Sequence, residues 1–354
     1  MFILALTTQA LAQQPADWVY QSGSVLDPTA VVLNGIPVTS IGNPSVVYDS
    51  IRGRWFMLFE AKLSTTDARC PQGLWAVGAA VSPDGVTWTP YTNAILKPAT
   101  GLGKFYGCVV SHPTAVFQPA LYAGNGGLVV MFKAEQENDA CAVVTPSWGC
   151  AVATGLGRLQ VELLPNGDPK KISLTQKPVH TPSTPTFGYP KMIQDKNNRY
   201  RVLYQAYPDI VSTTTTNLAS WPAAVTEITK ASGAVDWAVN EVFNPSFVCN
   251  DDLVGTNDYA VFVGGRDTNG ATVVEGSWGK AISAVATGAW VVDLTPQVSW
   301  TGNDTWRHWD VTRLASDEYL VWFDEKDGSG NNFIRFGGTT LAFANSDAVS
   351  KVCP

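Results

Sequence analysis

Residues 43–91 read NPSVVYDSIRGRWFMLFEAKLSTTDARCPQGLWAVGAAVSPDGVTWTPY, and this stretch decides the fold. It contains three apolar runs, at residues 45–48, 55–59 and 75–81. Turn residues at 49–53 and the sequence Ser-Pro-Asp-Gly at 82–85 bound these runs. β-branched and aromatic runs bounded by Gly, Pro, Asn and Asp are typical of antiparallel strands. The stretch therefore predicts three strands joined by hairpins, with residues 55–59 as an aromatic strand that ends at Glu60.

The same three-strand pattern recurs along the chain at intervals of roughly 55 to 80 residues. The first strand recurs near residues 111, 189, 244 and 308. The second recurs at residues 128–135, 200–207, 259–267 and 319–326, and the third at 149–159, 210–221, 279–290 and 336–344. Repeated strand units need neighbours like themselves to bury both faces. The pattern predicts an all-β, five-bladed β-propeller with antiparallel four-stranded blades. Residues 18–20 and 30–33 precede the first full blade and are strand-like, and a terminal segment of this kind often supplies the outer strand of the last blade and so covers a sheet edge.

Composition limits the classes of function. The chain has 354 residues, and its repeats continue to the end without a linker, which predicts one domain over residues 13–354. A net charge of −7 without a basic cluster argues against a nucleic-acid partner. No apolar run reaches the length of about 18 residues that a membrane span needs. The 13 tryptophans offer aromatic platforms for sugar rings, although core packing is the alternative for many of them.

The N-terminus and the cysteines favour an exported protein. Residues 1–12 read MFILALTTQALA and resemble the end of a signal peptide, with Ala10 and Ala12 at a cleavage site and a mature start near Gln13. The six cysteines form an even set, which in an exported chain predicts three disulfides. We expect Cys141–Cys150, Cys70–Cys108 and Cys249–Cys353, while other pairings stay open. None of the spacings is typical of a zinc site.

Propeller geometry brings distant residues to one opening of the central axis. The innermost strand of each blade begins at the same face to which the second strand returns. The beginnings of the inner strands contribute Asn43, His112, Tyr189, Lys191, Asn244, His308 and Asp310. The ends of the second strands contribute Glu60, Glu135, Asp209, Arg266, Asp267, Asp324 and Glu325. The opening is therefore expected to be rich in carboxylates.

Such an opening suits glycoside hydrolysis, which needs one carboxyl to protonate the leaving oxygen and another to activate water or attack. We expect Glu60, Glu135, Asp310 and Asp324 to be the catalytic carboxylates. A partly buried Glu60 would have the raised pKa that a general acid requires. We expect the substrate to be bound by Asn43, His112, Tyr189, Lys191, Asn244, Arg266 and Trp309. The alternative for each acid is a solvated charge at a strand end, and for each histidine or tryptophan a place in the core.

The motifs NPSVVYD, RWFMLFEA and VGAAVSPDGVTW resemble the first blade of the five-bladed β-propeller glycoside hydrolases, which include arabinanases, β-xylosidases, invertases and mannoside phosphorylases. In the arabinanase-like members, acids open the inner strands of the first, third and fourth blades. The matching positions here are Asn43, Tyr189 and Asn244, so that triad is missing. His308 matches a histidine near an axial metal, and this implies a structural calcium ion on the axis, although the chemistry requires no cofactor.

The resulting hypothesis is a secreted glycoside hydrolase that acts on a polysaccharide or oligosaccharide, with arabinose- or xylose-containing glycans as candidate substrates. Two alternatives stay open. The missing triad and the many tryptophans favour a non-catalytic carbohydrate-binding propeller. Low charge and the expected disulfides favour a structural surface or assembly protein.

Overall fold

A computed structural model describes residues 18–136, 154–182, 187–195, 197–230, 241–249, 259–269, 272–283, 290–292, 298–299, 308–315, 318–326 and 330–353. The predicted all-β class is confirmed. In these ranges the only helices are three 3-10 turns, η1 (Pro28–Ala30), η2 (Tyr122–Gly124) and η6 (Asn345–Asp347). No helix in the described part of the chain is long and apolar enough to cross a membrane.

The strands form antiparallel meanders in chain order. The first meander contains β2 (Val32–Leu33), β3 (Ile36–Asp49), β4 (Arg54–Leu63), β5 (Trp75–Ser82) and β6 (Thr89–Pro90). The second contains β7 (Val109–Gln118), β8 (Gly127–Glu135), β9 (Thr154–Leu163) and β10 (Pro169–Leu174). A single parallel pair, Trp75 with Val109, joins these two meanders into one nine-stranded sheet.

Three further sheets follow. One contains β11 (Phe187–Gln194), β12 (Tyr200–Ala206), β13 (Asp209–Thr215) and β14 (Val225–Ile228). The next contains β15 (Glu241–Cys249), β16 (Tyr259–Asn269), β17 (Thr272–Ser283), β18 (Val291–Val292) and β19 (Val298–Ser299). The last contains β20 (Trp309–Arg313), β21 (Tyr319–Lys326), β22 (Asn332–Gly338) and, from the N-terminus, β1 (Val19–Tyr20). Its third strand lies before the predicted residues 336–344, because β22 already pairs fully with β21 from Asn332 onward.

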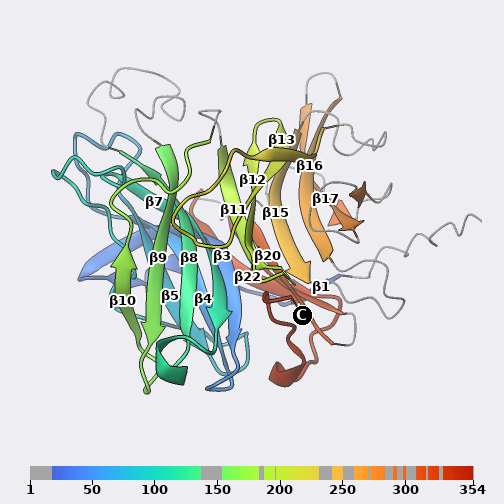
Figure 1. Cartoon of the computed structure of the whole chain (residues 1–354), viewed down its shortest axis with the longest axis horizontal. Coiled ribbons are helices and arrows are strands. Elements are labelled where there is room, and N and C mark those ends of the chain that lie inside the picture. Colours follow the sequence, from blue (N-terminus) through green and yellow to red (C-terminus); the bar gives the residue numbers. More distant parts are fainter. Residues whose placement is uncertain are drawn as a thin grey trace, which may run out of the picture.

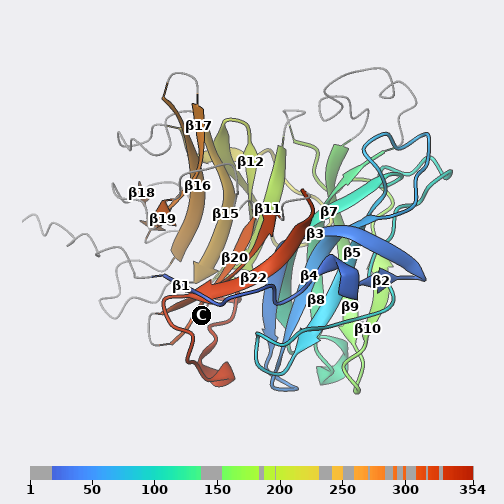
Figure 2. The same ribbon diagram turned by 180° about the vertical axis from the view of Figure 1, so that it is seen from behind.

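The first strands of the meanders surround a common axis. β3 contacts β7, β7 contacts β11, β11 contacts β15, β15 contacts β20, and β20 contacts β3. Figures 1 and 2 show blue β3 beside red β20, so that the beginning and the end of the chain meet. This closed order brings residues far apart in the sequence to the same opening.

Hydrophobic clusters between neighbouring sheets hold this arrangement together. Because successive side chains of a strand point to opposite faces, a strand between two sheets needs apolar residues at every position. In β4, Trp55 and Met57 join the cluster shared with the last sheet, whereas Phe56 and Leu58 join the cluster shared with the second meander. The continuous apolar runs of the second strands therefore reflect burial on both faces.

Four inner strands have the same bulge at their opening end. The residue before proline has a positive φ at Asn43 (47°), His112 (46°), Tyr189 (54°) and Asn244 (44°). Each lies where the register of its strand with the second strand shifts. Left-handed backbone at non-glycine residues costs about 1–3 kcal/mol each and clusters at functional sites. The bulges direct these four side chains differently from those of regular strand residues.

A set of hydrogen bonds below the bulges links the inner strands to one another. In four of the five inner strands, the side chain two positions after residue 43, 112, 244 or 308 accepts a backbone N–H of the neighbouring inner strand. The pairs are Ala115 N to Ser45 Oγ (3.0 Å), Met192 N to Thr114 Oγ1 (2.9 Å), Val311 N to Ser246 Oγ (2.8 Å) and Val46 N to Asp310 Oδ2 (2.6 Å). The equivalent position in β11 is Lys191, whose ammonium group can only donate. We call this set the axial ring.

Both ends of the chain close the structure. β1 pairs with β22, so of the two strand-like N-terminal runs it is residues 18–20 that supply an outer strand to the last sheet, whereas β2 pairs with β3. The C-terminal tail, residues 345–353, bonds back through Lys351 O to Gln194 N and through the Cys249–Cys353 disulfide. The predicted Cys70–Cys108 disulfide is also present, whereas Cys141 and Cys150 lie outside the described residues.

Candidate functional site

Glu60 lies at the centre of the opening. It pairs with Gly42 in β3, and β4 continues to Leu63, so Glu60 lies within its strand and not at the predicted strand end. Only 5% of the residue is exposed. Burial raises the pKa of Glu60, the charge of Asp324 raises it further, and His308, Asn43 and the His112 N–H oppose this rise. Glu60 is therefore a carboxyl that keeps its proton to a higher pH than usual.

His112 is the neighbour of Glu60 on the second meander. Its backbone N–H donates to Glu60 Oε2 at 3.1 Å, and its Nε2 lies 3.6 Å from the same oxygen. Its Nδ1 lies 3.5 Å from the N–H of Tyr189. Burial, with the charges of Lys133, His308 and Lys191, holds the pKa of His112 well below its usual value. His112 is therefore a neutral imidazole beside Glu60.

Asp324 and His308 form a pair on the last sheet. His308 Nδ1 lies 2.6 Å from Asp324 Oδ2, and the His308 N–H donates to Asp324 Oδ1 at 3.0 Å. Asn43 N–H donates to Asp324 Oδ2 at 3.3 Å. Asp324 is completely buried, so its oxygens serve these groups and do not reach solvent. A carboxylate on one ring nitrogen fixes the orientation of a histidine and leaves the other nitrogen for chemistry.

Gly42 provides the space for this pair. A Cβ added at Gly42 would lie 2.2 Å from Asp324 Oδ2, which is far inside van der Waals contact. Any side chain here would therefore displace the carboxylate that holds His308. The need for glycine at position 42 was not predictable from the sequence, because it depends on the position of Asp324 in a distant sheet.

Tyr189 joins the two halves of the site. Its ring centroid lies 4.8 Å from that of His112 and 4.9 Å from that of His308, and the two imidazoles are 6.0 Å apart. The structure thus brings together predicted residues of the first meander, the second meander, the β11–β14 sheet and the last sheet. We call Glu60, His112, Tyr189, His308 and Asp324 the axial cluster.

The asparagine at the β15 bulge has unused polar atoms. Asn244 is completely buried, and neither its Oδ1 nor its Nδ2 has a hydrogen-bond partner among the described residues. The amide of Asn43, a residue 2% exposed, instead lies beside Glu60 and opposes the rise of its pKa. Buried polar groups without partners are costly and often mark a ligand position. Both residues were predicted to bind substrate, and this stays a prediction.

Asp310 lies in a different environment, on the axis within the axial ring. The ammonium groups of Lys191 and Lys351 lie 3.5 Å and 2.5 Å from its carboxylate. Burial alone would raise the pKa of Asp310, but both lysines and the Val46 N–H outweigh this and hold it below its usual value. Lys191 also donates to Pro44 O at 2.7 Å, and burial lowers the pKa of Lys191 to about 8. These contacts make Asp310 and Lys191 structural groups.

Three further predicted residues lie away from the axial cluster. Trp309 is completely buried and packs on Phe243 at 5.9 Å, so the prediction that it stacks on substrate is wrong. Its neighbour Asp310 faces the axis, and the alternation of a strand therefore turns Trp309 into the core. Glu135 pairs with Lys133 at 2.9 Å near the end of β8. Arg266 lies in β16, and its side chain is outside the described residues.

The axial residues do not fit a calcium ion. Calcium takes six to eight oxygen ligands, mostly carboxylates and carbonyls. Asp310 is already paired with two ammonium groups, and Asp324 with His308 and Asn43 N–H. No group of acidic, histidine or cysteine side chains able to hold a metal is found within the described residues.

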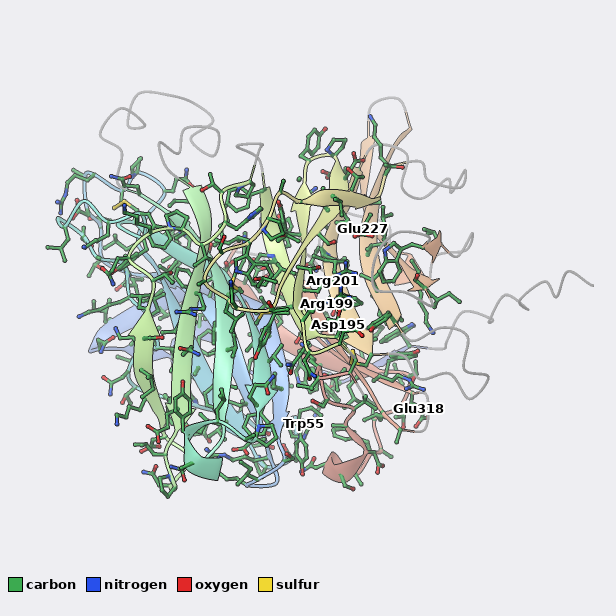
Figure 3. All side chains as sticks on the ribbon, in the orientation of Figure 1. Trp55, Asp195, Arg199, Arg201, Glu227 and Glu318 are labelled. Atoms are coloured by element: carbon green, nitrogen blue, oxygen red, sulfur yellow. A yellow bond between two sulfur atoms is a disulfide. The ribbon has the colours of Figure 1, made fainter. Side chains whose placement is uncertain are left out.

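Two buried polar contacts between neighbouring sheets escaped prediction. Gln205 Nε2 donates to Glu241 Oε2 at 3.0 Å, where β12 meets the beginning of β15. Farther from the axis, completely buried Arg201 lies 4.0 Å from Glu227, which also accepts from Trp290 Nε1 at 3.0 Å (Figure 3). The Gln205–Glu241 contact and the Trp290–Glu227 contact both join the sheet of β11–β14 to the region of β15–β19, and neither reaches the axial cluster.

No protein family model matches the sequence, and no curated protein matches it either. Solved structures do match. The β-1,2-mannobiose phosphorylase of Listeria innocua has a TM-score of 0.62 at 12% identity, over 91% of this chain and 96% of that chain. The endo-arabinase of Bacteroides thetaiotaomicron has a TM-score of 0.57 at 13% identity, over 90% and 99%. The exo-β-1,3-galactanase of Phanerochaete chrysosporium has a TM-score of 0.55 at 15% identity, over 94% and 66%.

The predicted resemblance is thus confirmed at the level of the fold. At 11–15% identity these likenesses carry no residue roles, and the matched proteins differ in the bonds that they cleave. Any function must therefore be argued from the axial cluster itself.

Proposed function

We propose that the protein is a secreted glycoside hydrolase built as a five-bladed, four-stranded β-propeller, with its active site at the axial cluster. The closed order of inner strands supports the blade count, and the two disulfides support export. The feature that supports catalysis most is a buried carboxyl of raised pKa next to a histidine oriented by a carboxylate.

Glu60 would act as the general acid. Its raised pKa keeps a proton available to a higher pH than in an ordinary glutamate, as protonation of a leaving sugar oxygen requires. Neutral His112 lies beside Glu60 Oε2 and brings no positive charge that would favour the carboxylate form of Glu60. The missing acid at Asn43 is thus replaced by a carboxyl on the neighbouring strand.

His308 would act as the general base. Asp324 binds its Nδ1, so Nε2 is the nitrogen left to accept a proton from water. Water attacks the anomeric carbon, the glycosidic C–O bond breaks, and the leaving oxygen takes the Glu60 proton. His308 holds the proton of the attacking water and returns it through solvent, so that Glu60 is protonated again. Asp324 acts through His308, because its own oxygens are occupied and buried.

The test is hydrolysis of a panel of arabinan, xylan, galactan and mannan. Glu60→Gln and His308→Gln should each lower turnover roughly 100-fold or more, which is the usual contribution of a general acid or base. Glu162→Gln is the matched control, because Glu162 pairs with Lys170 on the outer strands β9 and β10, away from the axial cluster. Unchanged turnover in Glu60→Gln would remove the assignment.

A second candidate function is carbohydrate binding without turnover. Its support is the absence of acids at Asn43, Tyr189 and Asn244, with the unused amide group of Asn244 at the opening. Glycan binding by the wild type, with no hydrolysis of any glycan in the panel, would select it.

A further inference from the structure

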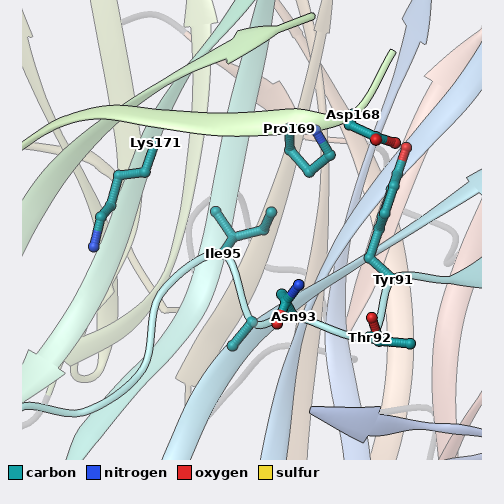
Figure 4. A pocket seen from close by; sticks show the side chains of 8 residues that line it. Tyr91, Thr92, Asn93, Ile95, Asp168, Pro169 and Lys171 are labelled. Carbon is teal, nitrogen blue, oxygen red and sulfur yellow. The ribbon is translucent and has the colours of Figure 1, made fainter. Parts of the chain in front are cut away.

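A pocket of about 410 Å³ lies away from the axis, on the outer strands of the first two meanders. One wall is residues 91–95, which follow β6, and the other is Asp168, Pro169 and Lys171 at the beginning of β10 (Figure 4). We call it the rim pocket. The volume is in the range of small-molecule sites, which is about 300–1,000 Å³.

We propose that the rim pocket is a second carbohydrate-binding site, which holds a segment of a neutral glycan chain while another part of the chain reaches the axial cluster. The choice of a glycan as the ligand rests on the proposed function, whereas the location and the lining residues of the rim pocket are independent of it.

The wall that carries the aromatic ring is held in place before any ligand binds. Tyr91 packs on Phe56 with centroids 5.9 Å apart, and its hydroxyl donates to Gly167 O at 3.3 Å. Arg54 Nη2 donates to the same oxygen at 2.5 Å. These contacts tie the first meander to the turn before β10. A preformed wall lowers the ordering cost of binding.

The lining matches the two-sided chemistry of a sugar ring. Ile95 is buried at the back, and Pro169 and the Tyr91 ring add apolar surface for the C–H face of a sugar. Asp168 lies close to the Tyr91 hydroxyl at one end and Lys171 lies at the other (Figure 4). Both are exposed, so their polar groups can reach sugar hydroxyls.

Asn93 adds an amide to this lining. Its Oδ1 accepts from Asn34 Nδ2 at 3.0 Å, and this bond orients its Nδ2 as a donor. The carboxylate of Asp168 and the ammonium group of Lys171 have opposite charges, so the pocket has little net charge. This favours a neutral polyhydroxylated ligand over a phosphate or a uronic acid.

The experiment compares two charge-neutral double variants. Asp168→Asn with Lys171→Ala removes the charged groups of the rim pocket. Glu162→Gln with Lys170→Ala removes the neighbouring pair, whose charged atoms are 3.6 Å apart and which does not line the pocket. Each is made in the wild type and in Glu60→Gln. Affinity electrophoresis in arabinan, xylan, galactan and mannan measures polymer binding, and turnover of a short oligosaccharide measures the axial site.

We expect the rim variant to bind the polymer about fivefold or more weakly than its control, with short-substrate turnover unchanged within about twofold. Equal polymer affinity in the two double variants would overturn the proposal, as would a wild type that binds no polymer. If the wild type binds polymer through the rim pocket but cleaves nothing, the rim site stands and the proposed hydrolase falls.

Discussion

The ammonium group of Lys351 donates a hydrogen bond of 2.5 Å to Asp310 Oδ2, so the C-terminal tail reaches the axis of the molecule. Asp310 also accepts the Val46 N–H, and Lys191 lies 3.5 Å from its other oxygen. Two ammonium groups therefore share one buried carboxylate.

Replacement of Asp310 should lower the free energy of unfolding more than replacement of Lys351. Lys351→Met leaves Asp310 paired with Lys191 and should lower the free energy of unfolding by about 1–2 kcal/mol. Asp310→Asn leaves two buried ammonium groups without a carboxylate and should cost about 3–5 kcal/mol. Urea unfolding measures both. A Lys351 variant that is less stable than the Asp310 variant would contradict this order.

Lys191 should make stability rise with pH in the alkaline range. Its pKa is lowered to about 8, so between pH 8 and 10 the unfolded chain binds more protons than the folded protein. The difference in free energy of unfolding between wild type and Lys191→Met should therefore increase by up to about 1.4 kcal/mol per pH unit in that window. It should be constant below pH 8. Urea titrations at pH 7, 8, 9 and 10 check this.

Glu60→Gln should stabilise the protein at neutral pH although it lowers turnover. The raised pKa of Glu60 means that the folded protein binds its proton more tightly than the unfolded chain. The free energy of unfolding of the wild type therefore falls as the pH rises above about 4.5, because ionisation of Glu60 is less favourable in the folded protein. A glutamine at this position does not ionise, so the variant shows no such fall. Calorimetry at pH 4 and pH 7 should show a gain at pH 7 only. A gain of the same size at pH 4 would point to a cause other than ionisation.

The dependence of kcat/KM on pH should have an alkaline limb, which comes from loss of the Glu60 proton. The residual activity of Glu60→Gln should lose this limb. An alkaline limb that survives in this variant would assign it to another group.

Gly42→Ala should lower the proposed glycan turnover without unfolding the protein. The added Cβ would lie 2.2 Å from Asp324 Oδ2, so the carboxylate must move away from His308. Gly188→Ala is the control, because its Cβ would lie 3.3 Å from His112 Cε1 and needs only a small shift. Turnover should fall more than about tenfold in the first variant and less in the second. Circular dichroism would verify that both remain folded.

Regular patterns made much of the fold predictable from the sequence. The apolar second strands, the Pro that follows Asn43, His112, Tyr189 and Asn244, and the intervening turns indicated repeated meanders, because each reflects local burial or a local backbone constraint. The positive φ at these four residues was not predictable, since it depends on the bulge that each strand makes against its partner.

The candidate site was predicted unevenly. Glu60 and Asp324 were found because the second strands of a propeller return to the opening at which the inner strands begin. Their separate environments depend on contacts between distant sheets, such as His308 with Asp324, which no local pattern encodes. Trp309 was misplaced because its neighbour Asp310 was also assigned to the opening, although adjacent strand residues face opposite sides.

The axial ring has one interruption, and it determines where the circle is weakest. Around the axis, a side-chain oxygen of each inner strand accepts a backbone N–H of the next strand, except between β11 and β15, because Lys191 can only donate. Heat or denaturant should therefore separate β11 from β15 first. The Cys249–Cys353 disulfide links β15 to the C-terminal tail, which also bonds to Gln194 of β11, so this disulfide holds the two strands together where the axial ring is interrupted.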